Sequence, residues 1–146
     1  MLREYLSDNH ARLDTALRQG DYEQFREGLL RHIGIEQKIL FPIVPDWPFV
    51  ERLHLDHGAI AALLVLTPTL AILTGIRTIL DNHNPVEEGS GGLYDECDRR
   101  LGTRADEVLK RIQEYPPVPV AKHVDSQIAV DSARNAVRRA GYSIDI

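Results

Sequence analysis

The sequence predicts an all-α protein, an up-down four-helix bundle with additional C-terminal helical segments. Apolar residues recur with a helical period almost everywhere, and no segment shows the two-residue alternation of a half-buried strand. The four long periodic segments are joined by short links, which is typical of antiparallel neighbouring helices. With 146 residues, of which 43% are hydrophobic, the chain has the size of one ordinary domain and can bury a core without disulfides.

The first two helices are delimited by turn and capping residues. The first helix runs to about Arg18, and Gly20 is expected to stop it. Asp21 then caps the second helix, and Gln24 completes a capping-box pattern. This helix is expected to end before Pro42, where the irregular link FPIVPDWP begins.

Prolines and glycines also delimit the next two helices. A third helix is predicted over about residues 49–66, ending before Pro68, and a fourth over about residues 69–88. Pro85 is expected to distort the last turns of the fourth helix. The run GSGG at 89–92 then breaks it.

The last third of the chain is predicted to add helical segments to the bundle. Residues 93–115 read as one more helix, kinked or interrupted near Gly102, and a final amphipathic helix is expected over roughly 124–140. We therefore divide the chain into two regions. Residues 1–115 are expected to form the four-helix bundle with its trailing helix. Residues 116–146 form a proline-containing spacer and a C-terminal helix that packs on the bundle or on a partner subunit.

The composition of the chain excludes several classes of partner. The 17 Lys and Arg against 22 Asp and Glu leave a mildly acidic chain without a basic stripe, so we expect neither nucleic acid nor a membrane as a partner. The apolar window at 59–76 is divided by Pro68 and reads as two helix ends, not as a membrane span. A lone Cys97 excludes an internal disulfide and fits a reducing compartment, and the charged N-terminus does not resemble a signal peptide. We expect a cytoplasmic protein.

The predicted core-facing stripes of the four helices carry histidines and glutamates among apolar residues. The second and fourth helices repeat one spacing, in which each HxxxE pair follows three apolar positions at a constant offset. The first and third helices match each other in the same way, with one histidine followed by two apolar positions. The stripes are Tyr22, Phe25, Leu29, His32, Glu36 and Leu40; Leu73, Ile76, Leu80, His83 and Glu87; His10, Leu13 and Leu17; and His57, Ile60 and Leu64.

Two carboxylates and four imidazoles inside one bundle imply a cation, because burying a carboxylate without a partner is costly. Residues at i and i+4 share a helical face, and imidazole with carboxylate suits divalent first-row metals. Six ligands are too many for one tetrahedral zinc, whereas two ions bridged by Glu36 and Glu87 use them all. The alternative is a metal-free buried network of His and Glu pairs. A single HxxxE is usually only a solvated pair, so the prediction depends on the matched set of motifs.

These motifs resemble those of the hemerythrin-like, or HHE cation-binding, domain family. The resemblance covers roughly residues 1–113. It implies a four-helix bundle holding a non-haem di-iron centre, with an oxo or hydroxo bridge and two bridging carboxylates, that binds dioxygen or a related small ligand. The motifs are SDNHARL, RHIGIEQKILFP, LDHGAIAALL and LDNHNPVEEG with the following GGLY, and the matching ligands are His10, His32, Glu36, His57, His83 and Glu87.

Two positions depart from the oxygen-carrying hemerythrins. The second histidine that those proteins place on the third helix falls here on Ala61, and His54 either reaches the site from the edge of the stripe or lies outside it. The carboxylate that they place five residues after the fourth-helix histidine falls on Glu88. Glu87 matches the spacing of His32 and Glu36, but a distortion at Pro85 would present Glu88 instead.

The resemblance and the motifs together predict a di-iron protein that binds O2, NO or peroxide for sensing, storage or detoxification, with other divalent metals as alternatives to iron. A di-iron enzyme of iron, oxidative or nitrosative stress chemistry and a metal-stabilised helical interaction module are the competing functions, and whether the protein is an enzyme is left open. We expect no catalytic dyad, a surface position for His123, and an unreactive Cys97 among acidic neighbours. Tyr5, Tyr22 and Tyr94 are candidate donors near the metal, or core residues. A homodimer through the C-terminal helix is one expected assembly.

Overall fold

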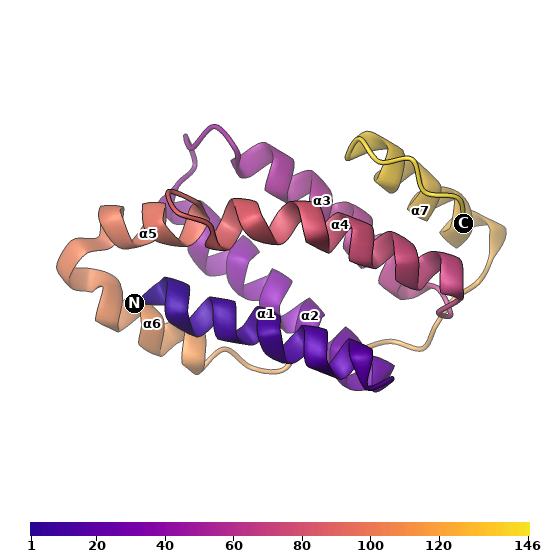
Figure 1. Ribbon diagram of the computed structural model, residues 1–146, viewed down its shortest axis with the longest axis horizontal. Helices are drawn as coiled ribbons and strands as arrows, with labels where there is room; N and C mark the ends of the chain where they lie inside the picture. The colour runs from indigo at the N-terminus through magenta and orange to yellow at the C-terminus, as the bar shows by residue number, and fades with distance from the viewer. The chain divides into compact units, whose positions relative to one another are not determined.

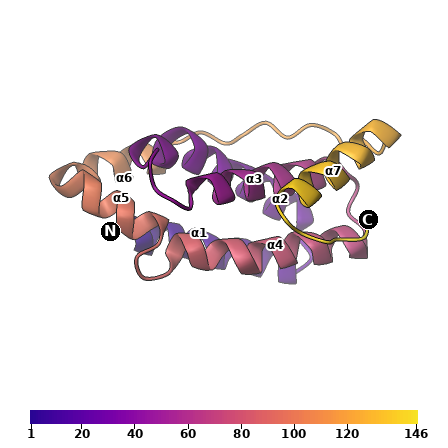
Figure 2. The ribbon, with the colours of Figure 1, turned by 90° about the horizontal axis from the view of Figure 1, so that it is seen from above.

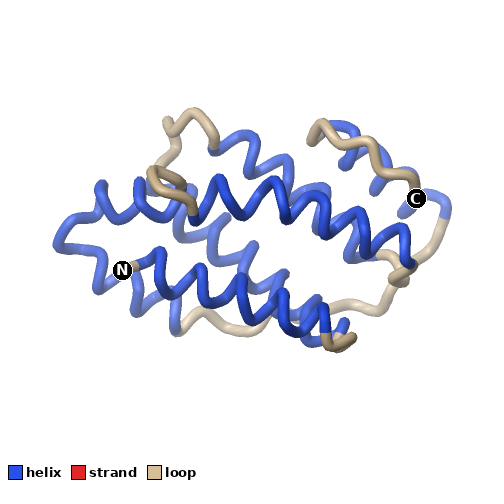
Figure 3. The backbone as a smooth tube through the Cα atoms, viewed as in Figure 1, coloured by secondary structure: helices blue, strands red, loops and turns tan.

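The computed structural model describes residues 1–146, and its regular elements are all helical, as Figure 3 shows. The predicted all-α class is confirmed. The chain divides into two compact units. In chain order the elements are α1 (Leu2–Arg18), α2 (Tyr22–Ile35), η1 (Glu36–Leu40), η2 (Phe41–Ile43), α3 (Val50–Val65), α4 (Leu70–Glu88), α5 (Leu93–Leu101), η3 (Gly102–Arg104), α6 (Ala105–Gln113) and α7 (Gln127–Arg139) (Figure 1).

Unit one comprises Met1–Val50 and Asn84–Val120. Its α1 and α2 form an antiparallel pair, and α5 also packs on α1 (Figure 1). The predicted connection between α1 and α2 is confirmed. Gly20 there has a φ of +77°, which residues with a side chain rarely adopt. The Asp21 carboxylate then accepts a hydrogen bond of 3.2 Å from the backbone N–H of Gln24 and so caps α2.

The helix that begins at Tyr22 changes its geometry at Glu36. The next turn, η1, is a π-helix in which the N–H of Phe41 donates to the carbonyl of Glu36, and a short 3-10 turn containing Pro42 follows. A proline ring clashes with the carbonyl four residues earlier in an α-helix, and a wider turn before Pro42 relieves that clash. Glu36 therefore lies at the junction where the helix widens.

Burial confirms the predicted stripe of the second helix. Phe25, Leu29 and Leu40 are buried together with His32 and Glu36, and Tyr22 at the start of the helix is half-buried. The contiguous stripe runs from α2 into η1, so both polar side chains face the interior of unit one.

Two apolar positions of the predicted buried stripe on the fourth helix are wrong. Leu73 and Leu80 are only half-buried, whereas Ile72 and Ile79 are buried with Ile76. Both sets repeat with a helical period, and both consist of large apolar residues, so periodicity alone does not choose between them. The error does not extend to the polar end of the helix, where the predicted residues are buried.

The buried face of the first helix also differs from the predicted stripe. Leu13 and Leu17 are half-buried, and the buried residues besides His10 are Leu2, Leu6 and Ala16. Leu2, Leu6 and His10 follow one another at four-residue steps along α1. The histidine therefore ends a row of leucines on the buried face of this helix.

Unit two comprises Glu51–His83 and Ala121–Ile146, with nearly all of α3, most of α4 and α7. In Figures 1 and 2, α7 lies beside α3. Two hydrogen bonds join the irregular segment before α7 to the chain at the end of α3. Val124 N–H donates to Val65 O at 3.0 Å, and the Thr67 hydroxyl donates to Asp125 at 2.6 Å. These contacts hold residues 124–126 out of the helix that the sequence predicts to begin at Val124, and α7 starts instead after its cap, Ser126.

Two further expectations concern proline and glycine within helices. The last turns of α4 stay helical through Pro85 as far as Glu88. The predicted interruption near Gly102 is confirmed, because α5 ends there and α6 begins only after the 3-10 turn η3. None of the helices combines the length and the apolar character needed to cross a membrane.

The Gly102→Ala variant tests the turn between α5 and α6. Gly102 has φ 55° and ψ −120°, a conformation almost restricted to glycine, so we expect a loss of about 1–3 kcal/mol in the free energy of unfolding, measured with urea. Gly58→Ala is the matched control, since this exposed helical glycine has open space around a new Cβ and the substitution should stabilise by about 0.5–1 kcal/mol. A Gly102→Ala protein as stable as the wild type would contradict the assigned turn.

Candidate metal centre

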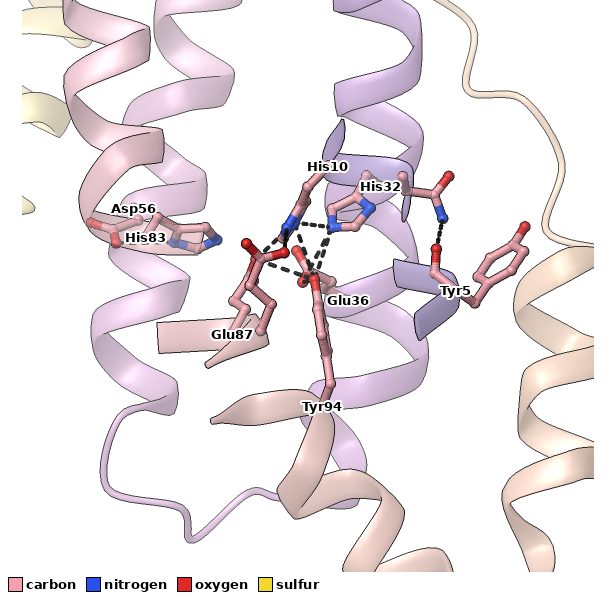
Figure 4. Close-up of polar contacts among 10 residues, drawn as sticks. Tyr5, His10, His32, Glu36, Asp56, His83, Glu87 and Tyr94 are labelled. Carbon is pink, nitrogen blue, oxygen red and sulfur yellow. Dashed lines mark hydrogen bonds and ion pairs between the residues drawn. The ribbon is translucent and has the colours of Figure 1, made fainter. Parts of the chain in front are cut away.

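Four side chains from four elements meet in the interior of unit one. His10 comes from α1, His32 from α2, Glu36 from the first position of η1 and Glu87 from the last turn of α4 (Figure 4). Their exposed fractions are 8%, 3%, 0% and 0%. One nitrogen or oxygen atom of each lies within 4.8 Å of those of the other three, so this group could hold a metal ion.

The distances among these atoms suit a cation better than a network of hydrogen bonds. His10 Nε2 lies 2.9 Å from His32 Nε2 and 3.3 Å from Glu87 Oε1, and His32 Nε2 lies 3.4 Å from Glu36 Oε2. Two imidazole nitrogens that face each other can share only one proton, and the carboxylates add further lone pairs to the same small space. Electron pairs thus converge from four side chains, and neutral imidazole with carboxylate is a donor set that binds first-row metals. The residues present fit a metal ion.

A fifth polar group from unit one enters the same cluster. The phenol of Tyr94, on α5, donates a 2.8 Å hydrogen bond to Glu36 Oε2 (Figure 4). Its side chain is completely buried. Burial, and then the charges of Glu36 and Glu87, raise the pKa of Tyr94 well above its usual value. In the metal-free protein the phenol therefore keeps its proton and serves as a donor.

Of the three tyrosines that the sequence offers as donors near the metal, the structure brings only Tyr94 into the cluster. The backbone carbonyl of Tyr5 accepts a hydrogen bond from Asn9, while Tyr22 lies near Phe25 with ring centroids 6.0 Å apart. Tyr94 is the tyrosine of the GGLY motif that follows the fourth predicted helix, and this motif is the one sequence feature that sets it apart from the other two.

Glu87 and Glu88, the two alternatives for the fourth-helix carboxylate, contact opposite sides of His10. Glu87 approaches Nε2, whereas Glu88 Oε2 lies 2.9 Å from Nδ1. Glu87 is fully buried and Glu88 is partly exposed. A carboxylate on the second nitrogen of a histidine fixes the tautomer and the ring orientation. Glu87 is thus placed among the converging atoms, and Glu88 is placed to orient His10.

The acidic surroundings alter the protonation of His10. Burial by itself lowers the pKa of this imidazole, but hydrogen bonds to Glu87 and Glu88 outweigh burial and raise the pKa to about 9. At neutral pH His10 in the metal-free cluster is therefore an imidazolium, held between the side chains of Glu87 and Glu88. A metal ion must displace that proton to bind His10 Nε2.

The other two predicted histidines meet in unit two. The rings of His57 on α3 and His83 on α4 have centroids 4.8 Å apart, and both side chains are buried. His83 Nδ1 lies 3.0 Å from Asp56 Oδ2. This leaves Nε2 of His83 as the nitrogen available to a metal. Both side chains are labelled in Figure 4.

Asp56 is a functional candidate that the sequence analysis missed. It is 0% exposed, and its Oδ1 has no hydrogen-bond partner. An acid directly before a stripe histidine was the only signal in the sequence, and such neighbours normally point away from the core. Tyr142 of the C-terminal segment lies near this carboxylate. Its burial and then the charge of Asp56 raise the pKa of Tyr142 to about 12.

The remaining candidates lie outside both groups. His54 is exposed on α3, and His123 is half-buried in the segment before α7. Burial first, and then the charge of Asp98, raise the pKa of Cys97 to about 12, as expected for an unreactive thiol. The structure thus brings His10, His32, Glu36 and Glu87 together in unit one, and His57 and His83 together in unit two.

Comparison with known proteins adds no assignment. No protein-family model, curated protein or solved structure matches the chain. The resemblance to hemerythrin-like domains therefore rests on the four motifs and on the chemistry of the residues that they place.

The raised pKa of His10 predicts a pH-dependent stability of the metal-free protein. Because the folded-state pKa of about 9 exceeds the ordinary value of 6.5, protonated His10 stabilises the fold fully below pH 6.5, and this contribution is lost as the pH rises through 9. Urea unfolding of the chelator-treated wild type and of His10→Gln should give a difference in unfolding free energy that shrinks between about pH 6 and about pH 9.5. His54→Gln, at an exposed position, is the control. A difference for His10→Gln that grows with pH would contradict the assignment.

Proposed function

We propose that this protein is a hemerythrin-like, non-haem di-iron protein that binds dioxygen or a related small ligand, such as NO or peroxide, for sensing, storage or detoxification. The observation that carries the proposal is the convergence of two imidazoles and two fully buried carboxyl groups on one point in unit one. The ordered set of four motifs along the chain supports the assignment to this family.

A metal explains the cluster better than a structural network of hydrogen bonds does. Burying a carboxylate costs several kcal/mol unless a cation and hydrogen bonds compensate. The proton on His10 supplies one positive charge, while Glu36 and Glu87 place two carboxyl groups beside it. A divalent or trivalent ion at the same point would neutralise both and would use the lone pairs that face one another.

The proposal of two ions follows from helical spacing. His32 and Glu36 are four residues apart on one helix, and His83 and Glu87 are four residues apart on α4. Each pair therefore shares a helical face, and each carboxylate has two oxygens with which to bridge two ions. We propose that His10 and His32 bind one ion, that His57 and His83 bind the other, and that the helices α1 to α4 form the four-helix bundle predicted from the sequence.

When bound, a pair of iron ions supplies one-electron chemistry and open positions for a small ligand. The chain's own contribution is orientation and exclusion of water. Glu88 holds His10 and Asp56 holds His83, each through the Nδ1 of the imidazole. The leucine row of α1 and the buried Ile39 and Leu40 beside Glu36 keep the surroundings dry.

Iron content after anaerobic reconstitution tests the proposal. Chelator-treated protein loaded with ferrous iron should bind about two ions per chain, as other di-iron carboxylate bundles do. Glu36→Ala and Glu87→Ala remove a proposed bridge and should lose most of the iron, whereas His54→Ala should keep it. Adding O2 or NO to the loaded wild type should change its optical spectrum.

Two results would count against a di-iron site. One is a wild type that retains no iron after desalting, as shown by elemental analysis. The other is an equal loss of iron in His54→Ala and Glu36→Ala, because that would make the loss unspecific. Circular dichroism of each variant shows whether a loss of iron reflects a loss of fold.

The Asp56→Asn variant tests the orientation of His83. An amide cannot hold the imidazole as the carboxylate does, so the affinity for iron should fall by about 10–100-fold, measured by competition with a chelating dye. Asp81→Asn, at an exposed position on α4, the helix of His83, serves as the control and should bind as the wild type does. An unchanged affinity in Asp56→Asn would show that Asp56 does not support a ligand.

A further inference from the structure

The phenol oxygen of Tyr94 lies within reach of every atom that converges in unit one. It is 2.8 Å from Glu36 Oε2, 3.1 Å from His32 Nε2, 3.2 Å from His10 Nε2 and 3.3 Å from Glu87 Oε1. A residue that only supports one ligand from outside approaches that ligand alone. The Tyr94 oxygen is within 3.3 Å of all four atoms, and Figure 4 shows its side chain pointing into their midst.

These separations match those between neighbouring ligands of one metal ion. Two donor atoms at about 2.0–2.2 Å from an ion are about 2.8–3.1 Å apart when they subtend a right angle, and about 3.3–3.6 Å apart at the tetrahedral angle. The distances from His10 Nε2 to His32 Nε2, from His10 Nε2 to Glu87 Oε1 and from His32 Nε2 to Glu36 Oε2 are 2.9, 3.3 and 3.4 Å. The distances from the Tyr94 oxygen to these atoms are similar, at 2.8–3.3 Å, so its oxygen is spaced as a further ligand of the same ion would be.

We propose that Tyr94 is a direct metal ligand, whose phenolate oxygen completes a donor set of two imidazoles, two carboxylates and one phenolate. The proposal rests on the proposed function, because it needs an ion in the cluster. On binding, the O–H bond of Tyr94 breaks, a bond from its oxygen to the metal forms, and the proton is released to solvent.

The backbone before Tyr94 holds the phenol in this position. The chain turns back sharply after Glu87, through a tight loop of glycines, and α5 begins at Leu93. A side chain at Gly92 would strike the carbonyl oxygens of Val86, Glu87 and Gly89, so only glycine permits this close return. Glu87 and Tyr94 are therefore brought to the same point by a short and rigid connection.

The donor set selects a particular kind of ion. The two carboxylates, which bridge both ions in the proposed site, and the phenolate are hard, anionic oxygens, and such donors favour ferric iron over softer divalent ions. A site of this composition stabilises the oxidised metal. It therefore favours redox turnover or sensing over reversible carriage of oxygen.

Optical and Raman spectra of the iron-loaded protein test the proposal. Full-length protein is loaded anaerobically with ferrous iron and then oxidised with ferricyanide. The wild type should show a visible phenolate-to-iron(III) charge-transfer band, and excitation in that band should enhance tyrosine ring modes in the Raman spectrum. In Tyr94→Phe both signals should disappear while iron is retained, whereas Tyr5→Phe and Tyr22→Phe should keep them.

The outcomes separate this inference from the function on which it rests. A wild type that binds iron but shows no such band, or a Tyr94→Phe protein that keeps the band, overturns the phenolate ligand and leaves the di-iron site standing. A wild type that binds no iron overturns both. If Tyr94→Phe does not fold, ring-deuterated tyrosine in the wild type still decides the matter, because a bound phenolate shifts the enhanced modes and their absence refutes ligation.

Discussion

The structure of unit one depends on how buried carboxyl groups are compensated. Glu36 and Glu87 are completely removed from solvent, and each is surrounded by imidazole and phenol groups instead of water. Burial of this kind is stable only if positive charge and hydrogen bonds accompany it. His10 supplies both in the metal-free protein, and its raised pKa records the interaction. The helices that contribute these side chains are thereby fixed against one another more strictly than apolar packing alone would require.

Irregular backbone collects around the same residues. Glu36 opens the π-helical turn, and a glycine loop follows Glu88. A second irregular turn in unit one lies at Gly102, between α5 and α6. Departures from local rules that gather at one place are expected at a functional site, because the geometry there is set by the site and not by helix propensity.

The sequence predicted the helices and the polar stripe residues, but not every group in the site. Periodicity identified His32, Glu36 and Glu87 as buried because a polar residue on an apolar stripe is a strong local signal. It chose Leu73 and Leu80 over Ile72 and Ile79 because both sets are apolar. Tyr94 was one of three candidate tyrosines that the sequence could not separate by contact, because its place depends on the glycine turn before it. Asp56 was missed, because its role depends on a histidine of the neighbouring helix.

The adjacent glutamates at the end of α4 have a consequence for how this segment can change. Glu87 and Glu88 meet opposite nitrogens of one imidazole. Deleting one residue before them would put Glu88 in the place of Glu87 and Gly89 in the place of Glu88, whereas inserting one would put Val86 in the place of Glu87. Either change turns the later residues of the helix by about 100° around its axis and leaves one of the two positions without a carboxylate. The site consequently depends on the helical register of Glu87 and Glu88 as much as on their residue type, so the end of α4 tolerates a change in length poorly.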